Sequence, residues 1–386
     1  MPAPRWRGRR RAGHVGIGVL VLASIMGAGT CALPRADPPR ALDVRGASRV
    51  ETALGSRYGA GPVRRFLLGD GYRDAWAAPV DLPVLELSEL GGGALPIRRG
   101  GGGQTLTLHL RGRDGNRYVF RSVDKNQGGT LSALPRAILG PVRQDQVSAL
   151  HPGAALVAAS LHRSAGLPQM APRLVVMADD PTLGRFRREF AGLPGIVERY
   201  PGDGFAGAPE VVSTEDLWPE LRAGGEVDVR GFLATRLLDV YLGDWDRHEG
   251  QWRWAGTPRA EGTLWVPIAR DRDYALTDYR GALPALARWI DPKVVRFDRE
   301  YRDLGGLLVK ARPLDLRLLC GLRRPTWDSA ATALARSLTD AEIARAVSQL
   351  PPEHARQRLQ GILQARRDRL PSAAARFHRS LRRSCG

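Results

Sequence analysis

The chain has 386 residues, of which 43% are hydrophobic and 25% are charged. These fractions are typical of globular proteins and exclude a largely disordered chain, and the length predicts two or three structural units. The formal net charge is +18, but only Lys125, Lys293 and Lys310 are lysine, so the other 55 of the 58 basic residues are arginine. These arginines are scattered along the chain. We therefore interpret the charge as a bias of composition and expect no nucleic-acid partner.

The N-terminus has the pattern of a signal peptide over residues 1–31. A basic segment from Arg5 to Arg11 precedes an apolar stretch from Val15 to Ala28, which is short for a membrane span. The basic flank favours the cytoplasmic side, so the rest of the chain is predicted to be exported to the periplasm or cell envelope. Three fates stay open: cleavage, lipid modification as a lipoprotein at Cys31, and an uncleaved anchor. Residues 32–79 are expected to form a linker and N-terminal extension.

Alternating segments separated by turn signals predict a β-rich unit over residues 80–202. Strands are expected at 81–87, 105–110, 118–123, 173–178 and 195–200, and a helix at 152–166. Asp114-Gly115 is a hairpin turn signal between the second and third of these strands. Lys125 follows the third strand. This chain uses arginine wherever a plain cation suffices, so a remaining lysine is expected where a compact ammonium group is needed.

From residue 203 to residue 386 the pattern is mainly helical. Apolar spacing predicts a strong helix at 229–242 that ends at Gly243, and two strands follow at 252–254 and 264–268. Further helices are expected at 214–221, 315–322, 327–337, 341–349, 353–369 and 373–384. The predicted fold class is therefore α+β, with a β-rich half before a helical half. Cys320 falls in an apolar helical stretch and is expected to be a buried thiol; a disulfide with Cys385 is the alternative.

Polar residues gather where the two halves meet. Residues 243–251 read Gly-Asp-Trp-Asp-Arg-His-Glu-Gly-Gln, and Asp271-Arg272-Asp273 ends the second of the two strands that follow. Phosphoryl transfer needs a carboxylate to orient the attacking hydroxyl, oxygen ligands for Mg²⁺ and a cation beside the phosphates. These segments contain such groups. The alternative is a surface turn in which Asp244, Asp246 and Asp271 pair with neighbouring arginines.

Asp246-Arg247-His248, which follows a helix and Gly243, resembles the catalytic loop of several atypical kinases. Similar loops occur in secretory-pathway kinases, in HipA-type kinases and in CotH-like and phosphoinositide kinases. The chain also resembles a bacterial group of uncharacterised exported proteins that share Gly-Asp-Trp-Asp-Arg-His-Glu and Arg-Ser-Val-Asp-Lys segments, some of them joined to an outer-membrane β-barrel. The resemblance implies a two-lobed protein-kinase-like fold, with an N-lobe at 80–202 and a C-lobe at 203–386.

The resemblance also implies roles for individual residues. The expected catalytic residues are Asp246 and His248; the expected nucleotide-binding residues are Lys125, Arg121 and Glu198; and the expected metal ligands are Gln251, Asp271 and Asp273. The implied function is an exported kinase that moves a phosphoryl group from ATP or another nucleotide, with Mg²⁺ or Mn²⁺, to an unknown protein or small-molecule acceptor.

Two features depart from the kinase pattern. Gln251 stands where HipA-type enzymes carry a metal-binding asparagine, and the helix at 152–166 has no carboxylate to pair with Lys125, for which Asp124 and Asp145 are the nearest alternatives. An inactive kinase-like envelope module that binds an outer-membrane or cell-surface partner is therefore the alternative function. A metal-dependent phosphoesterase is a third hypothesis, which the scarcity of histidine disfavours.

Overall fold

The structure is a computed structural model that describes residues 33–34, 41–101, 104–127, 140–350 and 353–385. The predicted signal segment with Cys31 lies outside these residues. The chain divides into two units at Leu33, and all that follows concerns the second unit, residues 34–386. In the described part of the chain, no helix has the length and apolar character needed to cross a membrane.

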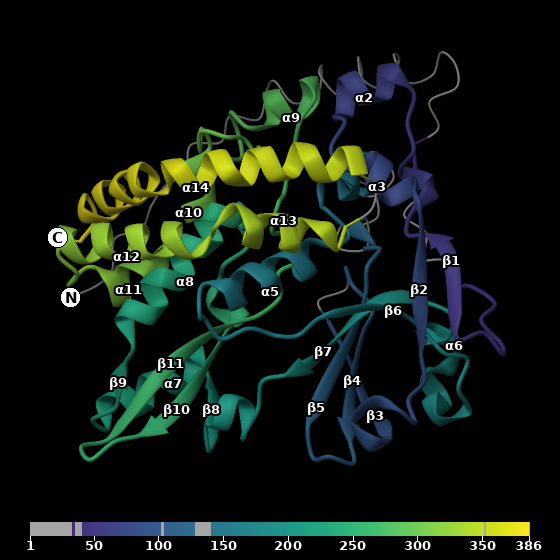
Figure 1. Ribbon diagram of the computed structural model, residues 1–386, viewed down its shortest axis with the longest axis horizontal. Coiled ribbons are helices and arrows are strands. Elements are labelled where there is room, and N and C mark those ends of the chain that lie inside the picture. Colours follow the sequence, from purple (N-terminus) through teal and green to yellow (C-terminus); the bar gives the residue numbers. More distant parts are fainter. Residues whose placement is uncertain (1–32, 35–40, 102–103, 128–139, 351–352, 386) are drawn as a thin grey trace, which may run out of the picture. The chain divides into compact units, whose positions relative to one another are not determined.

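The N-terminal half is built on a seven-stranded sheet (Figure 1). The strand order is β1-β2-β6-β7-β5-β4-β3, and only β2 and β6 pair in parallel. The bounds are Arg49–Ala53 for β1, Pro79–Leu85 for β2, Ala94–Gly100 for β3, Thr107–Gly112 for β4, Arg117–Ser122 for β5, Arg173–Met177 for β6 and Pro194–Tyr200 for β7. The predicted hairpin is confirmed: Asp114 Oδ1 accepts from the Asn116 N–H at 2.9 Å, and Gly115 adopts a φ of +79° in the turn.

The two faces of this sheet differ in chemistry because side chains alternate along each strand. One face carries Leu108, Phe120 and Val197, which pack with Phe186 and Phe190 in an apolar core. The strand register identifies the residues of the other face. His109 of β4 pairs with Val119 of β5, and Val119 pairs with Glu198 of β7. At these strands the opposite face is therefore polar, and it points toward the C-terminal half.

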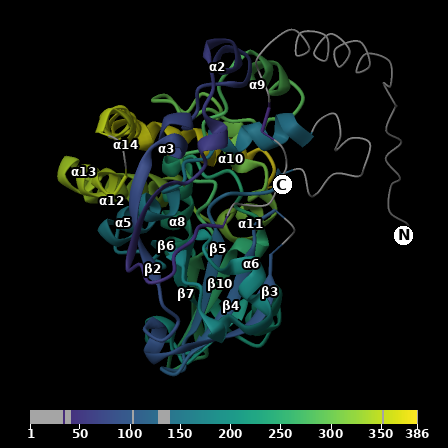
Figure 2. The same cartoon turned by 90° about the vertical axis from the view of Figure 1, so that its right-hand side faces the viewer.

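The C-terminal half contains a four-stranded sheet, of order β8-β10-β11-β9, and most of the helices. The strands are β8 (Glu210–Ser213), β9 (Glu226–Val227), β10 (Trp252–Pro258) and β11 (Thr263–Ala269). The helices of the chain are α2 (Pro62–Leu68), α3 (Arg73–Ala77), α5 (Ala154–Ser164), α6 (Arg187–Phe190), α7 (Thr214–Arg222), α8 (Val229–Leu242), α9 (Ala282–Ala287), α10 (Leu304–Leu308), α11 (Arg312–Leu319), α12 (Arg324–Ser337), α13 (Asp340–Ser348) and α14 (Glu353–Arg382). In both views the long C-terminal helices α12 to α14 lie on the same side of the strands (Figure 1 and Figure 2).

Helix α8 is the central helix of this half, and the sequence explains both of its ends. Asp228 caps its start by accepting from the Gly231 N–H at 2.9 Å, and Gly243 ends it in the left-handed conformation, with a φ of 68°. Its apolar residues join a large core with three buried tryptophans of the neighbouring strands: Trp252, Trp254 and Trp265. The predicted helix at 229–242 is confirmed residue for residue.

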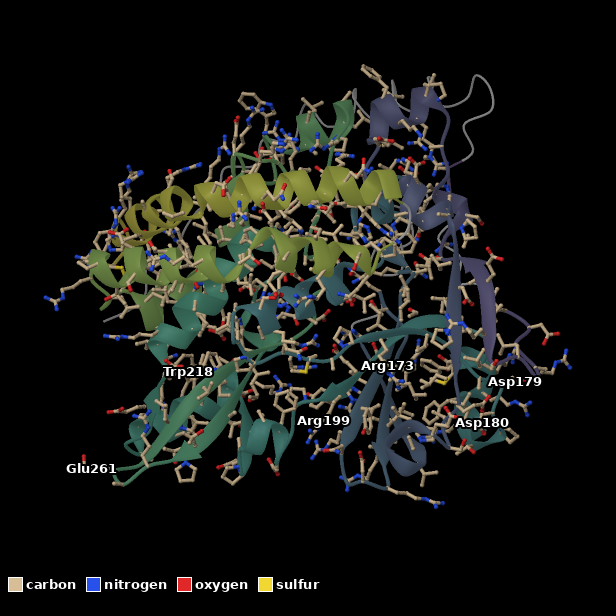
Figure 3. The ribbon with its side chains drawn as sticks, in the orientation of Figure 1. Arg173, Asp179, Asp180, Arg199, Trp218 and Glu261 are labelled. Carbon is tan, nitrogen blue, oxygen red and sulfur yellow. A yellow bond between two sulfur atoms is a disulfide. The ribbon has the colours of Figure 1, made fainter. Side chains whose placement is uncertain are left out.

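Side chains fill the layer between these helices and the two sheets (Figure 3). Trp218 of α7, which is labelled there, lies under the guanidinium group of Arg317 of α11, 3.5 Å from its ring centroid. This cation–π contact connects the smaller sheet region to the helices.

Two expectations about the helices and the N-terminal extension need correction. The two helices expected at 353–369 and 373–384 form one helix, α14, with Pro371 inside it. Leu370, Ala373 and Phe377 are buried in the same core, so tertiary packing of a continuous apolar stripe outweighs the local cost of a proline. In addition, part of the expected linker is ordered: β1 pairs with β2 and widens the sheet.

The expected free thiol at Cys320 is also wrong, because Cys320 and Cys385 form a disulfide across 65 positions. Contacts between α11 and the end of α14 bring the two cysteines together, which local sequence patterns do not reveal. By loop-closure entropy a bond across such a loop stabilises the fold by about 4 kcal/mol.

We therefore predict that a reducing agent lowers the urea midpoint of unfolding of the wild-type chain. The double variant Cys320→Ser/Cys385→Ser is expected to match the reduced wild type and to be insensitive to the reducing agent. Equal midpoints for oxidised and reduced wild-type protein would contradict a stabilising disulfide.

Candidate active site

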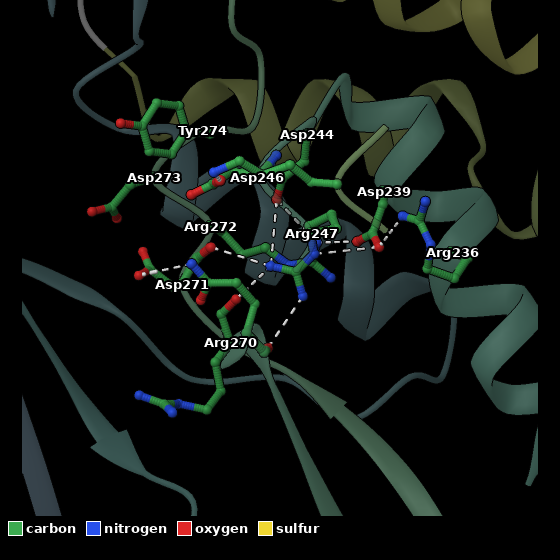
Figure 4. A network of polar contacts seen from close by, with 12 residues as sticks. Arg236, Asp239, Asp244, Asp246, Arg247, Arg270, Asp271, Arg272, Asp273 and Tyr274 are labelled. Atoms are coloured by element: carbon green, nitrogen blue, oxygen red, sulfur yellow. Dashed lines mark hydrogen bonds and ion pairs between the residues drawn. The ribbon is translucent and has the colours of Figure 1, made fainter. Parts of the chain in front are cut away.

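A buried network of charges anchors the loop that follows α8 (Figure 4). Asp239 accepts from Arg236 Nη1 at 2.7 Å, lies 3.4 Å from Arg247 Nε and also pairs with Arg272. Asp244 lies 3.2 Å from Arg272 Nη1. Burial alone would raise the pKa of Asp239, but Arg272, Arg247 and Arg236 outweigh burial and hold that pKa well below its usual value. The network therefore keeps the start of the loop fixed against α8.

Arg247 joins this loop to the end of β11. Its Nη1 donates to the carbonyl of Arg270 at 2.7 Å and to that of Asp271 at 3.3 Å, and its Nη2 donates to the carbonyl of Gln251 at 3.3 Å. The side chain is fully buried. Arg247 is thus a positioning residue that sets the distance between the loop and Asp271. The salt-bridged-turn alternative accounts for Asp244 but not for Asp246 or Asp271.

Asp271 lies in the loop that follows the end of β11. Its φ is +53°, which a non-glycine residue rarely adopts. Its Oδ2 accepts from Gln251 Nε2 at 3.3 Å. Burial would raise the pKa of Asp271, but Arg121 and Lys125 together with the Gln251 hydrogen bond lower it far below its usual range. The carboxyl group is therefore ionised at neutral pH.

Lys125 comes to this site from the β-rich half. Its ammonium donates to Asp273 Oδ2 at 3.0 Å and lies 4.6 Å from the centroid of the Tyr274 ring. Burial would lower the pKa of Lys125, but Asp273, Tyr274 and Asp271 raise it, so the group stays protonated. The carboxylate that pairs with Lys125 is thus on the 271–273 segment and not at either of the positions considered from sequence.

Those two positions have other partners. Asp124 accepts from the Tyr58 hydroxyl at 2.5 Å and pairs with Arg57 at 2.6 Å. Asp145 is fully buried between Arg64 and Arg73. Asp124 holds the 3₁₀ turn near Tyr58 beside the end of β5, and Asp145 holds α2 and α3 together, so neither carboxylate is part of the site.

A chain of contacts through Lys310 and two aromatic rings connects Asp246 to Lys125. Asp246 pairs with Lys310, whose ammonium is 5.0 Å from the centroid of the Trp245 ring, and Trp245 contacts Tyr274 edge-on with centroids 4.8 Å apart. The Tyr274 ring also makes the cation–π contact with Lys125. Two of the three lysines of the chain therefore flank one aromatic pair. Sequence reasoning missed Lys310, although the scarcity of lysine was a signal that could have found it.

The other predicted residues take different positions. Arg121 and Glu198 form a buried ion pair, 3.0 Å between Nη2 and Oε1, and Arg121 lies 3.8 Å from Asp273. His248 is exposed, and its Nδ1 accepts from the Gly250 N–H at 3.1 Å, which closes the turn before Gln251. The structure therefore places Lys125, Arg121, Glu198, Gln251, Asp271 and Asp273 around one segment, with Asp246 next to it. The hydrogen bond of the His248 ring lies within its own turn.

A small cavity borders Lys125, Arg121 and Asp273 and reaches Trp76 and the start of α5. About 20 Å³ of it is open to a water-sized molecule, which is room for about one water. This cavity is therefore too small to hold a nucleotide.

The donor atoms near Asp271 fit Mg²⁺ or Mn²⁺. Such ions take one or two protein carboxylates, keep several waters and use substrate phosphates as further ligands. The carboxylate of Asp271 and the amide of Gln251 are adjacent, and Asp273 belongs to the same segment. Among the residues that the structure describes, no three His, Cys, Asp or Glu side chains form a metal site by themselves. The set thus suits a metal that is shared with a phosphate ligand.

Comparison with known proteins gives structural likenesses alone, because no protein-family model and no curated protein matches the chain. The chain is similar to the Helicobacter pylori proinflammatory kinase CtkA, with 13% identity and a TM-score of 0.36 over 71% of this chain and 94% of that one. It is similar to HipA of a Shewanella oneidensis MR-1 toxin–antitoxin system, solved with HipB and operator DNA, with 12% identity and a TM-score of 0.37 over 78% and 77%.

A Golgi casein kinase aligns with 11% identity and a TM-score of 0.34, over 86% of this chain and 84% of that one. With TM-scores below 0.5, no residue role is carried over from any of the three. The structure itself has the predicted α+β class, with a β-rich half before a mainly helical half.

Proposed function

We propose that this chain is an exported kinase-like enzyme that transfers a phosphoryl group from a nucleotide to the hydroxyl of a protein or small-molecule acceptor. One observation supports this most. Lys125 of the β-rich half meets Asp273, and Asp271 on the same segment meets Gln251 of the loop after α8. A cation, an ionised carboxylate and an amide thus converge from segments more than 100 residues apart, as binding of a metal-bound phosphate requires.

In this proposal Asp246 would act on the acceptor. Its carboxylate is half-buried and accepts from Lys310, so it is oriented and keeps further acceptor capacity for a hydroxyl proton. Lys310 would offer its ammonium to the oxygens of the group in transfer. Asp246 pairs with Lys310 and Lys125 pairs with Asp273, so the acceptor and the donor would have separate contacts.

The phosphate donor would bind at Lys125 and Asp271. Lys125 would exchange its bond to Asp273 for bonds to phosphate oxygens, which frees Asp273 to join Asp271 and Gln251 as an oxygen ligand. A bound Mg²⁺ or Mn²⁺ would neutralise charge that develops on the phosphates. The role of this chain is to hold these groups at fixed spacing, and Arg247 does so through the carbonyls of Arg270, Asp271 and Gln251.

Export is supported by two features of the chain. The N-terminal segment has a basic and then an apolar part, as signal peptides do. The Cys320–Cys385 disulfide suits an oxidising compartment such as the periplasm. Lipid attachment at Cys31 and an outer-membrane β-barrel partner stay predictions from the sequence.

The proposal is tested by measuring nucleotide turnover by the purified chain with Mg²⁺, with Mn²⁺ and with a chelator. We expect turnover and a nucleotide-induced rise in melting temperature that both need metal, and we expect Asp271→Asn to abolish both. Asp291→Asn, which removes a partly exposed carboxylate paired with Lys293, is the matched control and should change neither. Binding without turnover by any nucleotide would favour the inactive-module alternative. If no nucleotide shifts the melting temperature with either metal, the enzyme function is wrong.

A further inference from the structure

The polar face of the large sheet carries a group of arginines next to Asp271. Strand register places Arg121, Glu198 and Tyr200 on one face, because residues alternate and Val119 lies opposite Glu198. Arg253 at the start of β10 and Arg270 at the end of β11 reach the same place from the C-terminal half. Their contacts with Tyr200 define the cluster.

Tyr200 is enclosed by these side chains. The guanidinium carbon of Arg270 lies 4.2 Å from the centroid of the Tyr200 ring, and Arg253 Nη2 donates to the Tyr200 hydroxyl at 2.9 Å. His109 contacts the ring edge-on, with centroids 5.6 Å apart. The ring is therefore covered by an arginine on one face, which leaves little of it for stacking on a nucleobase.

The cluster has more positive than negative charge. Glu198 offsets Arg121, but within the described part of the chain no carboxylate lies within ion-pair distance of Arg253 or Arg270. Arg121 is only 6% exposed; its Nη2 lies 3.0 Å from Glu198 Oε1, but its Nε has no hydrogen-bond partner in the described structure. A buried guanidinium with an unsatisfied N–H group is costly unless an acceptor binds there.

The pKa values of His109 and Tyr200 are both shifted by the positive charge of the cluster. Burial lowers the pKa of His109 to about 4, with Arg98, Arg270, Arg121 and Arg117 acting in the same direction. Burial would raise the pKa of Tyr200, yet Arg270 and Arg253 lower it below its usual value. Both shifts are those expected beside a site that favours anions.

We propose that Arg121, Arg253 and Arg270 bind the phosphate chain of the donor, so that the donor is an oligophosphate recognised through its phosphates and not through a base. Arg270 directly precedes Asp271, so phosphates held by the cluster lie beside the metal ligands. Arginine forks match phosphate oxygens in pairs, whereas a base needs an apolar slot that this charged face does not offer. That this oligophosphate is the donor rests on the proposed phosphotransfer. That it binds to the three arginines does not depend on that function.

The test is a binding titration of the purified, disulfide-intact chain with inorganic tripolyphosphate and with ATP at equal free Mg²⁺. We expect dissociation constants within about tenfold of each other, since the base adds little. Arg270→Gln and Arg253→Gln should each weaken binding of both ligands by about tenfold, the effect of losing a charge-assisted hydrogen bond. Arg188→Gln, on the exposed side of α6, should leave both unchanged. The second cluster variant keeps the test decisive if the first one misfolds.

Two outcomes overturn this inference while the proposed function stands: ATP binds at least 100-fold more tightly than tripolyphosphate, or the cluster variants bind both ligands as the wild type does. Tripolyphosphate binding that depends on Arg253 and Arg270, with no phosphoryl transfer from either compound, supports the binding site and contradicts the enzyme function. Transfer from tripolyphosphate to an acceptor supports both.

Discussion

Replacement of Asp246 by asparagine is expected to lower the rate of phosphoryl transfer by about 10³-fold and to leave donor binding within about twofold of the wild type. Asparagine has the same shape and still accepts from Lys310, but it cannot take a proton from the acceptor hydroxyl, and a positioned general base contributes roughly 10²–10⁴-fold. Lys125 pairs with Asp273 and Asp246 pairs with Lys310, so the donor contacts stay intact.

The measurement is single-turnover transfer from a labelled donor, together with a binding titration of the same protein. Lys310→Met is the informative second variant, since it removes the ammonium but leaves the Asp246 carboxylate in place. Asp340→Asn alters an exposed carboxylate paired with Arg367 and is the control. A rate for Asp246→Asn within tenfold of the wild type would show that another residue orients the acceptor.

Replacement of Asp239 by alanine is expected to lower the free energy of unfolding by about 3–5 kcal/mol, the range observed when one partner of a buried ion pair is removed. Asp239 is fully buried and pairs with Arg236, Arg247 and Arg272. Among the residues that the structure describes, its loss leaves three buried guanidinium groups with only Asp244 and Asp315 as carboxylate partners.

Urea unfolding checks this result, with the slope of the transition used to confirm that only stability has changed. Asp340→Ala is the matched control, because an exposed pair such as Arg367–Asp340 contributes about 0–1 kcal/mol. Equal midpoints for the two variants would mean that water or rearrangement compensates the arginines, and that the network does not hold the loop after α8.

Local sequence patterns were sufficient to predict the helix and the hairpin that lie beside the site. Helix α8 and its end at Gly243 follow from apolar spacing, a capping aspartate and a glycine, all within 16 residues of one another. The Asp114-Gly115 hairpin likewise depends on neighbours in the chain. The motif that contains Asp246 and the pairing of its loop with the 271–273 segment were predictable because each lies directly beside such an element.

Long-range contacts were not predictable in this way. Lys125 finds its carboxylate 148 residues away at Asp273, and Lys310 lies 64 residues from Asp246. No periodicity records such a pairing, since it depends on how the sheet packs against the helices. The arginines around Tyr200 were not predictable either. The sequence contains 55 scattered arginines, and strand register and packing decide which of them share a face.

The sequence by itself determined the α+β order of elements, the central helix and the carboxylate loop, because these depend on interactions between residues close along the chain. The tertiary structure alone decided the partner of Lys125, the part played by Lys310, the Cys320–Cys385 disulfide and the continuity of α14 through Pro371. Each of these depends on burial and on contacts between distant segments, whose free energy exists only once the chain has folded.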